Sequence, residues 1–394
     1  MAILGIRGTG NWGADERPKN FRETILRRTP NGSAPLTALL SKLKSQPVDD
    51  PEFSWWEELQ SIVRVRVDGT GASASSTTIG VTADGFTLVP GDLVMVEKAD
   101  QIIYDNEMLE VSSVASDTSV VFKRGAAGTT AAAIPASAYL TKISPRYEEG
   151  SGAPMSVIRN PTKVFNYTQI VKTSYEITRT ADKTHARTGS ALTNDKKRRM
   201  TDHSTSLEQM LLFGRKSEVT GPNGKPMRTT GGVRSFLQTN VKVYTTTPTL
   251  NSFLDALAPM FDYDIGDAGN ERLGLCGNGF LMSLNKLVMN NAQVRINYDS
   301  PIEVYGMKLF RLTLPQGTIY LRTHPLLNVH PLWTYSAFFL EPSNLRYRYI
   351  TDTTPQDNIQ LPDADTKKGQ WLTEAGLELW GEQTHAYIGN FLVP

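Results

Sequence analysis

The stretch that most constrains the fold is 188–216, TGSALTNDKKRRMTDHSTSLEQMLLFGRK, the longest run with helix-compatible spacing and no proline. Thr188 or Ser190 is suited to the N-cap position, because a hydroxyl oxygen there can accept a backbone N–H of the first turn. Small and apolar residues near its end recur at i, i+3, i+4 and i+7, one face of a helix: Leu207, Met210, Leu211 and Gly214. The sequence therefore predicts one long helix, and 190–214 would span roughly 37 Å at about 1.5 Å per residue.

The middle of this helix is strongly cationic. Lys196, Lys197, Arg198 and Arg199 occupy a full turn, whereas the apolar face thins there to Leu192 and Met200. Such a helix cannot lie at the centre of an ordinary core, so we expect it to lie across a sheet or a neighbouring chain. One interpretation of the cationic turn is a solvated face, and the alternatives are salt bridges between subunits or contact with enclosed nucleic acid.

Composition excludes several classes of protein. The chain has 41 Lys and Arg against 40 Asp and Glu, a net charge of +1, so no general basic field favours condensation of nucleic acid. The single cysteine, Cys276, excludes an internal disulfide and a zinc site with four thiolates. No apolar run approaches the 18 or so residues of a membrane span, and the first residues lack the pattern of a signal peptide. We expect the chain to stay in the compartment where it is made.

The first 50 residues read as an extended basic arm. Glycine and proline interrupt every candidate element except 35–44, which has the leucine spacing of a short amphipathic helix. The arm cannot bury enough apolar surface alone, so it is expected to order on a neighbour. Residues 8–13 match G-x-G-x-x-G, but Pro18 interrupts the helix that should follow, and a flexible arm is the better interpretation.

Two adjacent tryptophans, Trp55 and Trp56, close the arm. Neighbouring side chains point to different sides of any regular element, so at least one tryptophan is expected outside the local core. The pair is either an ordinary core anchor or a docking contact for another element or subunit.

Residues 61–144 change to short β runs separated by turns, which predicts a small β-barrel or sandwich inserted into the main fold. The stretches 69–78 and 146–154 are its expected hinges. A strand pair is predicted at 164–180, leading into the long helix. The remainder is expected to be an α+β body, whose predicted elements include a strand at 86–89 in the insertion, helices at 249–258 and 283–290, and a buried strand at 273–280.

No catalytic or metal-binding pattern stands out. The five histidines show no helical metal spacing, and Asp202, His203 and Ser204 face different directions on a helix, so they cannot form a relay. Asp262, Asp264 and Asp267 are better interpreted as a solvated acidic loop than as calcium ligands. The sequence predicts neither an enzyme nor a cofactor.

Three motifs carry a resemblance: FSWWE at 53–57, NYTQI and EITRT within 166–180, and LEQMLLFGR at 207–215. They are similar to one branch of the major capsid proteins of tailed bacteriophages, which has the Hong Kong 97-like fold and carries a β insertion. The resemblance implies an α+β subunit that self-assembles into an icosahedral shell around double-stranded DNA. Two alternatives remain: an encapsulin-like cellular compartment, and a β-rich phage tail or adhesion protein.

The resemblance also implies a division of the chain: an N-terminal arm at 1–56, an extended E-loop at 57–182 with the insertion at about 69–144, a spine helix at 183–229, a mainly axial domain at 230–330, and a return to the peripheral domain at 331–394. The expected assembly-interface residues are Trp55, Trp56, Tyr167, Arg179, Arg198 and Arg199.

The implied partners are copies of the same chain in hexamers and pentamers, then portal and decoration proteins. Because the chain has no fused helical scaffold region, a separate scaffold or none is expected. No membrane partner is expected, and the implied location is the virion, assembled in the host cytoplasm.

Overall fold

The computed structural model describes residues 37, 39, 43–58, 63–97, 106–154, 156, 160–263, 270–290, 302–304 and 307–393. The chain divides into two compact units: unit 1 combines Met1–Trp55 with Val164–Pro394, and unit 2 is Trp56–Lys163. Unit 1 combines helices with mainly antiparallel strands, which confirms the α+β class. Unit 2 includes more residues at both ends than the insertion expected at 69–144.

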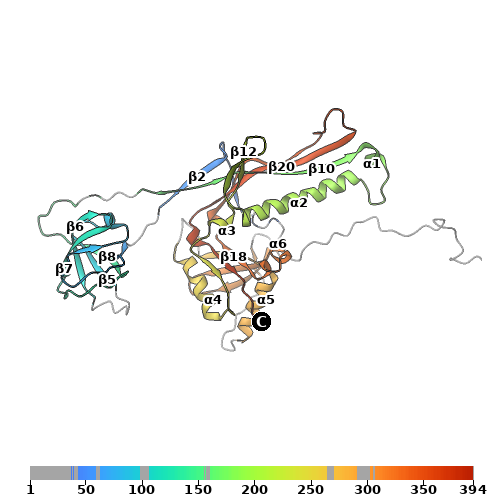
Figure 1. Cartoon of the computed structure of the whole chain (residues 1–394). Helices are drawn as coiled ribbons and strands as arrows, with labels where there is room; N and C mark the ends of the chain where they lie inside the picture. Colours follow the sequence, from blue (N-terminus) through green and yellow to red (C-terminus); the bar gives the residue numbers. More distant parts are fainter. Residues whose placement is uncertain are drawn as a thin grey trace, which may run out of the picture. The chain divides into compact units, whose positions relative to one another are not determined.

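The predicted long helix is confirmed as α2, Ala191–Phe213. Its N-cap is Ser190, whose Oγ accepts the Thr193 N–H at 3.4 Å, and Gly214 follows its last residue. The helix lies along β10 (Gln169–Thr178) and β20 (Thr366–Leu379), as Figure 1 shows. A short helix, α1 (Arg179–Lys183), joins β10 to it.

The sheet beside α2 has the order β1-β19-β20-β10, where β1 is Lys44–Pro47 and β19 is Leu345–Gln356. β1 runs parallel to β19 and the other neighbours are antiparallel. The region 164–180 does contain two strands, β9 (Thr162–Tyr167) and β10, but the expected pairing between them is wrong. β9 pairs with β2 (Glu52–Glu57) instead, and the Thr168 N–H between them donates to the Pro51 carbonyl at 2.8 Å.

A second sheet of unit 1 has seven strands in the order β13-β21-β18-β14-β17-β16-β15. Their bounds are Val241–Val243, Ala386–Gly389, Ala337–Leu340, Glu271–Cys276, Thr318–Thr323, Met307–Thr313 and Ile302–Val304. Alternate side chains of these strands enter two different apolar clusters. Leu273 and Leu275 lie in the cluster that contains the end of α2, whereas Ile319 and Leu321 lie in the cluster of α4 (Leu250–Leu257) and α5 (Asn278–Asn290). The sheet thus separates two cores.

The remaining elements of unit 1 are short. They are α3 (Val233–Phe236), α4 (Leu250–Leu257), α5 (Asn278–Asn290), α6 (Pro325–Val329), the hairpin β11 (Ser217–Thr220) with β12 (Pro226–Thr229), and 3₁₀ turns at Ala258–Phe261, Trp333–Tyr335, Pro342–Asn344 and Glu382–Thr384. The strand predicted at 273–280 is wrong beyond Cys276, because Gly277 lies against the Thr334 backbone and α5 begins at once.

Unit 2 is a small β-barrel. Its sheet order is β3-β8-β5-β6-β7-β4, and a bridge between Val67 and Val81, just beyond the two edge strands, closes it. The strands are Arg64–Arg66, Tyr139–Pro145, Asp92–Glu97, Met108–Ser116, Ser119–Ala126 and Thr78–Gly80 in that order. Their inward side chains form a separate apolar cluster.

Two expectations for unit 2 are wrong. The strand at 86–89 is a 3₁₀ turn, Gly85–Thr87, which follows Asp84 in a left-handed conformation at φ 64°. The stretch 69–78 is not a hinge, since Ala72 pairs with Ile134 and residue 78 begins β4.

Candidate assembly surfaces

The last part of the N-terminal arm is fixed to its own subunit. Leu39 is buried in the cluster of α2, and its N–H donates to the buried Glu208 carboxylate at 2.7 Å. His324 Nε2 lies 3.2 Å from the same oxygen, while His324 Nδ1 accepts the Leu326 N–H at 3.2 Å. This pattern assigns the ring proton to Nε2, so the imidazole donates to Glu208.

These contacts correct the expectation that the arm as a whole orders on a neighbour, because its last part packs against its own chain. Leu39 and β1 belong to unit 1, whereas residues 1–36 lie outside the described residues, as do the glycine motif at 8–13 and most of the helix expected at 35–44. Lys44, the last residue of that expected helix, begins strand β1.

Deleting residues 1–46 is therefore expected to lower the free energy of unfolding by roughly 3 kcal/mol, because Leu39 burial is lost and Glu208 loses a buried donor. The single substitution Leu39→Ala should account for most of this loss. Urea denaturation followed by circular dichroism measures both. Deleting residues 1–36 leaves these contacts in place and is the matched control, so equal stability of the two deletions would contradict the arm's structural role.

A polar layer joins α2 to the sheet. The buried His203 ring contacts Thr173 Oγ1 at 3.0 Å through Nδ1 and Thr373 Oγ1 at 2.7 Å through Nε2. Burial lowers the pKa of His203 below its ordinary value, so the neutral ring is favoured. Sequence reasoning considered this histidine only as a relay member. Its hydroxyl partners are 30 and 170 residues away in the chain, and no local pattern reveals them.

The cationic turn of α2 divides into an inward and an outward part. Lys196 Nζ pairs with Asp357 Oδ2 at 2.9 Å and lies over the Tyr175 and Trp371 rings. Arg199 contacts Asp202 on its own helix at 3.3 Å, a surface pair between half-exposed side chains. Arg198 is exposed and has no ion-pair partner in the part of the chain that the structure describes. Both outward arginines are exposed on the surface of α2.

The expected interface residues fall into two groups. Trp55 is 7% exposed and stacks on Phe53, whereas Trp56 is 64% exposed, so the tryptophans take opposite faces of β2 as the sequence predicted. Tyr167 lies on β9, the partner strand of β2, in edge-to-face contact with Phe165. The three arginines form the other group, on α1 and α2. Arg179 begins α1 and makes an exposed pair with Asp365 at 2.8 Å.

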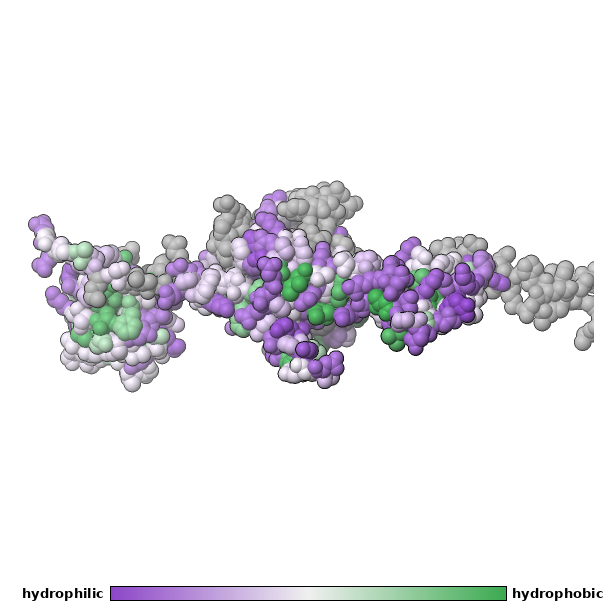
Figure 2. All heavy atoms as spheres, turned by 90° about the horizontal axis from the view of Figure 1, so that it is seen from above, coloured by the Kyte–Doolittle hydropathy of each residue, from purple (hydrophilic) through white to green (hydrophobic). Residues whose placement is uncertain are grey.

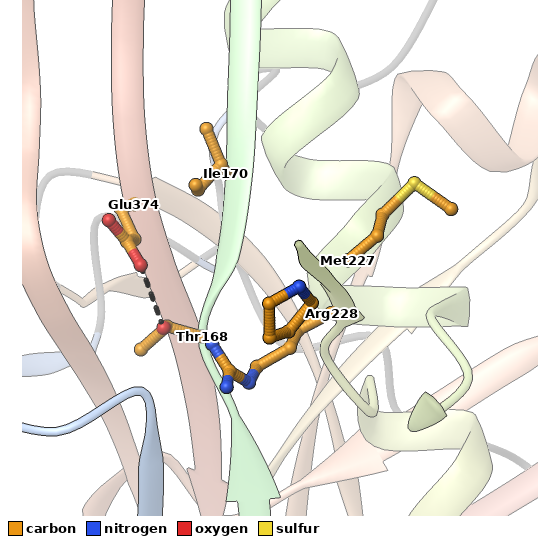
Figure 3. Close-up of a pocket in the computed structure, with 6 residues that line it drawn as sticks. Thr168, Ile170, Met227, Arg228 and Glu374 are labelled. Atoms are coloured by element: carbon orange, nitrogen blue, oxygen red, sulfur yellow. Dashed lines mark hydrogen bonds between the residues drawn. The ribbon is translucent and has the colours of Figure 1, made fainter. Parts of the chain in front are cut away.

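The β11–β12 hairpin was not predicted from the sequence. Met227 on β12 and Ile170 on β10 are both more than half exposed and border a shallow pocket of about 130 Å³. In Figure 3, Ile170 and Glu374 line one side from β10 and β20, and Met227 and Arg228 line the other from β12. The Thr168 hydroxyl donates to Glu374 Oε1 at 3.3 Å on the floor between the strands.

The surface seen from above is mixed in character. Unit 1 shows mostly hydrophilic residues there, with small hydrophobic patches between them (Figure 2). Among the described residues no group of three or more His, Cys, Asp or Glu could hold a metal ion. Asp264 and Asp267, weighed as cation ligands, are not among the described residues. No described helix is both long enough and apolar enough to span a membrane.

Most of the chain is similar to known major capsid proteins. The family model for the SU10 major capsid protein matches residues 5–391. The major capsid protein of Pseudomonas phage PaMx41 is 27% identical over 316 residues, which cover 78% of this chain and 73% of that protein.

Among solved structures, the capsid of a native GTA particle is 9% identical, with a TM-score of 0.49 and 98% of each chain covered. The holo-SrpI encapsulin complex of Synechococcus elongatus PCC 7942 is 10% identical, with a TM-score of 0.41, and covers 59% of this chain and 76% of that one.

Proposed function

Since the chain belongs to the SU10 major capsid protein family, and is thus the major capsid protein of a phage, we propose that its copies close into an icosahedral shell around double-stranded DNA. The match over residues 5–391 carries this proposal, because it includes the arm, both units and the long helix. The DNA would be contained without sequence-specific binding, in line with a net charge of +1.

We assign the chain the Hong Kong 97-like organisation. The arm would be 1–56, the E-loop 57–182 with the barrel inserted in it, the spine helix region 183–229, the axial domain mainly 230–330, and the returning segment 331–394. The order of an arm, an inserted barrel, a long helix on a sheet ribbon and a second α/β layer supports this assignment.

The proposed subunit interface includes Trp56, Arg198 and Arg199, which are exposed. Tyr167 and Arg179 are proposed with them, and Trp55 supports Trp56 from the buried face of β2. The subunits would form hexamers and pentamers in the host cytoplasm with a separate scaffold or none, and join portal and decoration proteins. The chain would act as a structural protein without a catalytic role or a cofactor.

Reversing both charges in Arg198→Glu with Arg199→Glu is expected to lower the yield of shells at least about tenfold, while helix content stays unchanged, because exposed charges steer and select partners rather than hold the fold. Electron microscopy counts the shells and circular dichroism checks the helix. The matched double substitution to Gln should have an intermediate effect. Unchanged yields would mean that both arginines belong to a solvated face of α2 and take no part in assembly.

Negative-stain electron microscopy of the purified chain tests the function itself. Closed isometric shells are the expected result. Rings or fibres alone would favour a tail or adhesion protein. Shells that enclose protein cargo and no nucleic acid would favour a cellular compartment. A uniform monomer that persists after scaffold is added would contradict the proposal.

A further inference from the structure

Two arginines lie next to each other at one border of the seven-stranded sheet. Arg311 on β16 is directly opposite Tyr320 on β17, and Arg322 lies two residues farther along β17 on the same face. Diagonal neighbours of this kind lie about 7–8 Å apart, within reach of long side chains.

The residues around Arg322 on this face of the sheet are largely apolar. Leu275, directly opposite Arg322 on β14, and Tyr320 both contribute to the cluster beneath α2. The two arginines therefore stand where that apolar face ends, and Arg322 is only 8% exposed. Nε and Nη1 of Arg322 and Nε of Arg311 are buried and have no hydrogen-bond partner among the described residues.

A buried guanidinium without a partner is costly, and a second positive charge beside it adds to the cost. Burial lowers the pKa of Arg322, the direction expected for a charge that nothing compensates. Glu271, at the start of β14, instead accepts the Tyr320 hydroxyl at 3.0 Å, and within the described residues it forms no ion pair with either arginine. Within the part of the chain that the structure describes, this pair of charges is unmatched.

We propose that Arg322, together with Arg311, receives the carboxylate of an acidic side chain from a second copy of this chain. The planar guanidinium fork matches a carboxylate through two parallel hydrogen bonds. Arg322 is only 8% exposed, so the end of one acidic side chain can reach it. A DNA backbone cannot, because its phosphates bind exposed cations. The inference rests on the proposed shell, which brings copies with 40 acidic residues each against one another.

The substitution Arg322→Met tests this, because methionine keeps much of the apolar stem and removes the charge. The dispersed variant is expected to melt at the same temperature as the wild-type chain or higher. The protein concentration at which it assembles should rise about tenfold or more, as expected when a buried interface pair is lost. Light scattering and electron microscopy of nuclease-treated protein measure assembly, and Arg311→Met should shift it in the same direction. Arg66→Met removes one exposed charge from unit 2 and is the matched control.

Several results would overturn the inference. A lower melting temperature of Arg322→Met would mean that the guanidinium is matched within the chain. Equal assembly of variant and wild type would mean that no second copy uses it, and a defect seen only with DNA present would assign the site to phosphates. Inorganic phosphate that stabilises the dispersed wild-type chain but not Arg322→Met would assign it to a free anion. A wild-type chain that forms no shells would contradict the proposed function, and this inference with it.

Discussion

Replacing Arg272 by alanine is expected to lower the free energy of unfolding of unit 1 by about 3–5 kcal/mol, because it leaves a buried carboxylate without its cation. Arg272 is fully buried, and its Nη1 lies 3.3 Å from Glu341 Oε2. Its Nε donates to the Thr384 carbonyl at 3.0 Å and its Nη2 donates to the Met260 carbonyl at 3.2 Å. One guanidinium thus joins β14 to three distant segments of the chain.

Urea denaturation of the dispersed chain, followed by tryptophan fluorescence, measures the effect. Arg228→Ala is the matched control, because Arg228 pairs with Glu218 at 2.9 Å on the surface hairpin, where ion pairs contribute at most about 1 kcal/mol. A loss below 1 kcal/mol for Arg272→Ala would show that the buried network is dispensable.

A second large effect is expected in unit 2, where Arg124→Ala should destabilise the barrel by about 3–5 kcal/mol without unfolding unit 1. The Arg124 side chain, which is 7% exposed, donates to both oxygens of Glu107 at 2.8 and 2.6 Å and to the Ser73 and Ser76 carbonyls at 2.6 and 2.8 Å. Burial raises the pKa of Glu107, but the bonds from Arg124 and two backbone N–H groups outweigh it, so the pKa lies below its ordinary value. The Arg124–Glu107 pair therefore connects β7 to the residue before β6, and Arg124 also connects β7 to the loop before β4.

Limited proteolysis with mass spectrometry separates the two units. Cleavage should increase within 56–163 in Arg124→Ala, while fragments of 164–394 stay protected. Arg64→Ala is the matched control, since Arg64 pairs with Glu97 on the exposed surface of the same barrel. Equal loss of protection in both units would mean that the barrel does not fold independently.

Sequence patterns predicted the elements whose formation depends on the spacing of residues close together in the chain. The spacing of Leu207, Met210 and Leu211 located α2, and all three side chains are buried. Adjacent positions on β2 were expected to point to opposite faces, and Trp55 is buried whereas Trp56 is exposed. Burial along α4 does not follow from hydrophobicity alone: Phe253 and Leu257 are buried, but Leu254 is 39% exposed.

Contacts between distant residues could not be predicted in this way. His203 and Glu208 are polar residues on the buried face of α2, and their partners lie on other strands and on the arm. The spacing of apolar residues cannot reveal His203 and Glu208, because polar residues only interrupt that spacing. The same holds for Arg322, whose unmatched nitrogens are visible only once the register of β16 and β17 is known.

The strand order of unit 1 has a consequence for a chain that is still being synthesised. The sheet beside α2 needs β19 and β20, and the seven-stranded sheet needs β21 between β13 and β18, so neither is complete until residues 345–389 have been made. Pairings across such sequence separations also form slowly. The barrel, whose strands all lie within residues 64–145, can fold far earlier. Nascent neighbours on one messenger RNA would therefore carry folded barrels but incomplete sheets in unit 1. This order of events delays association until each subunit is whole.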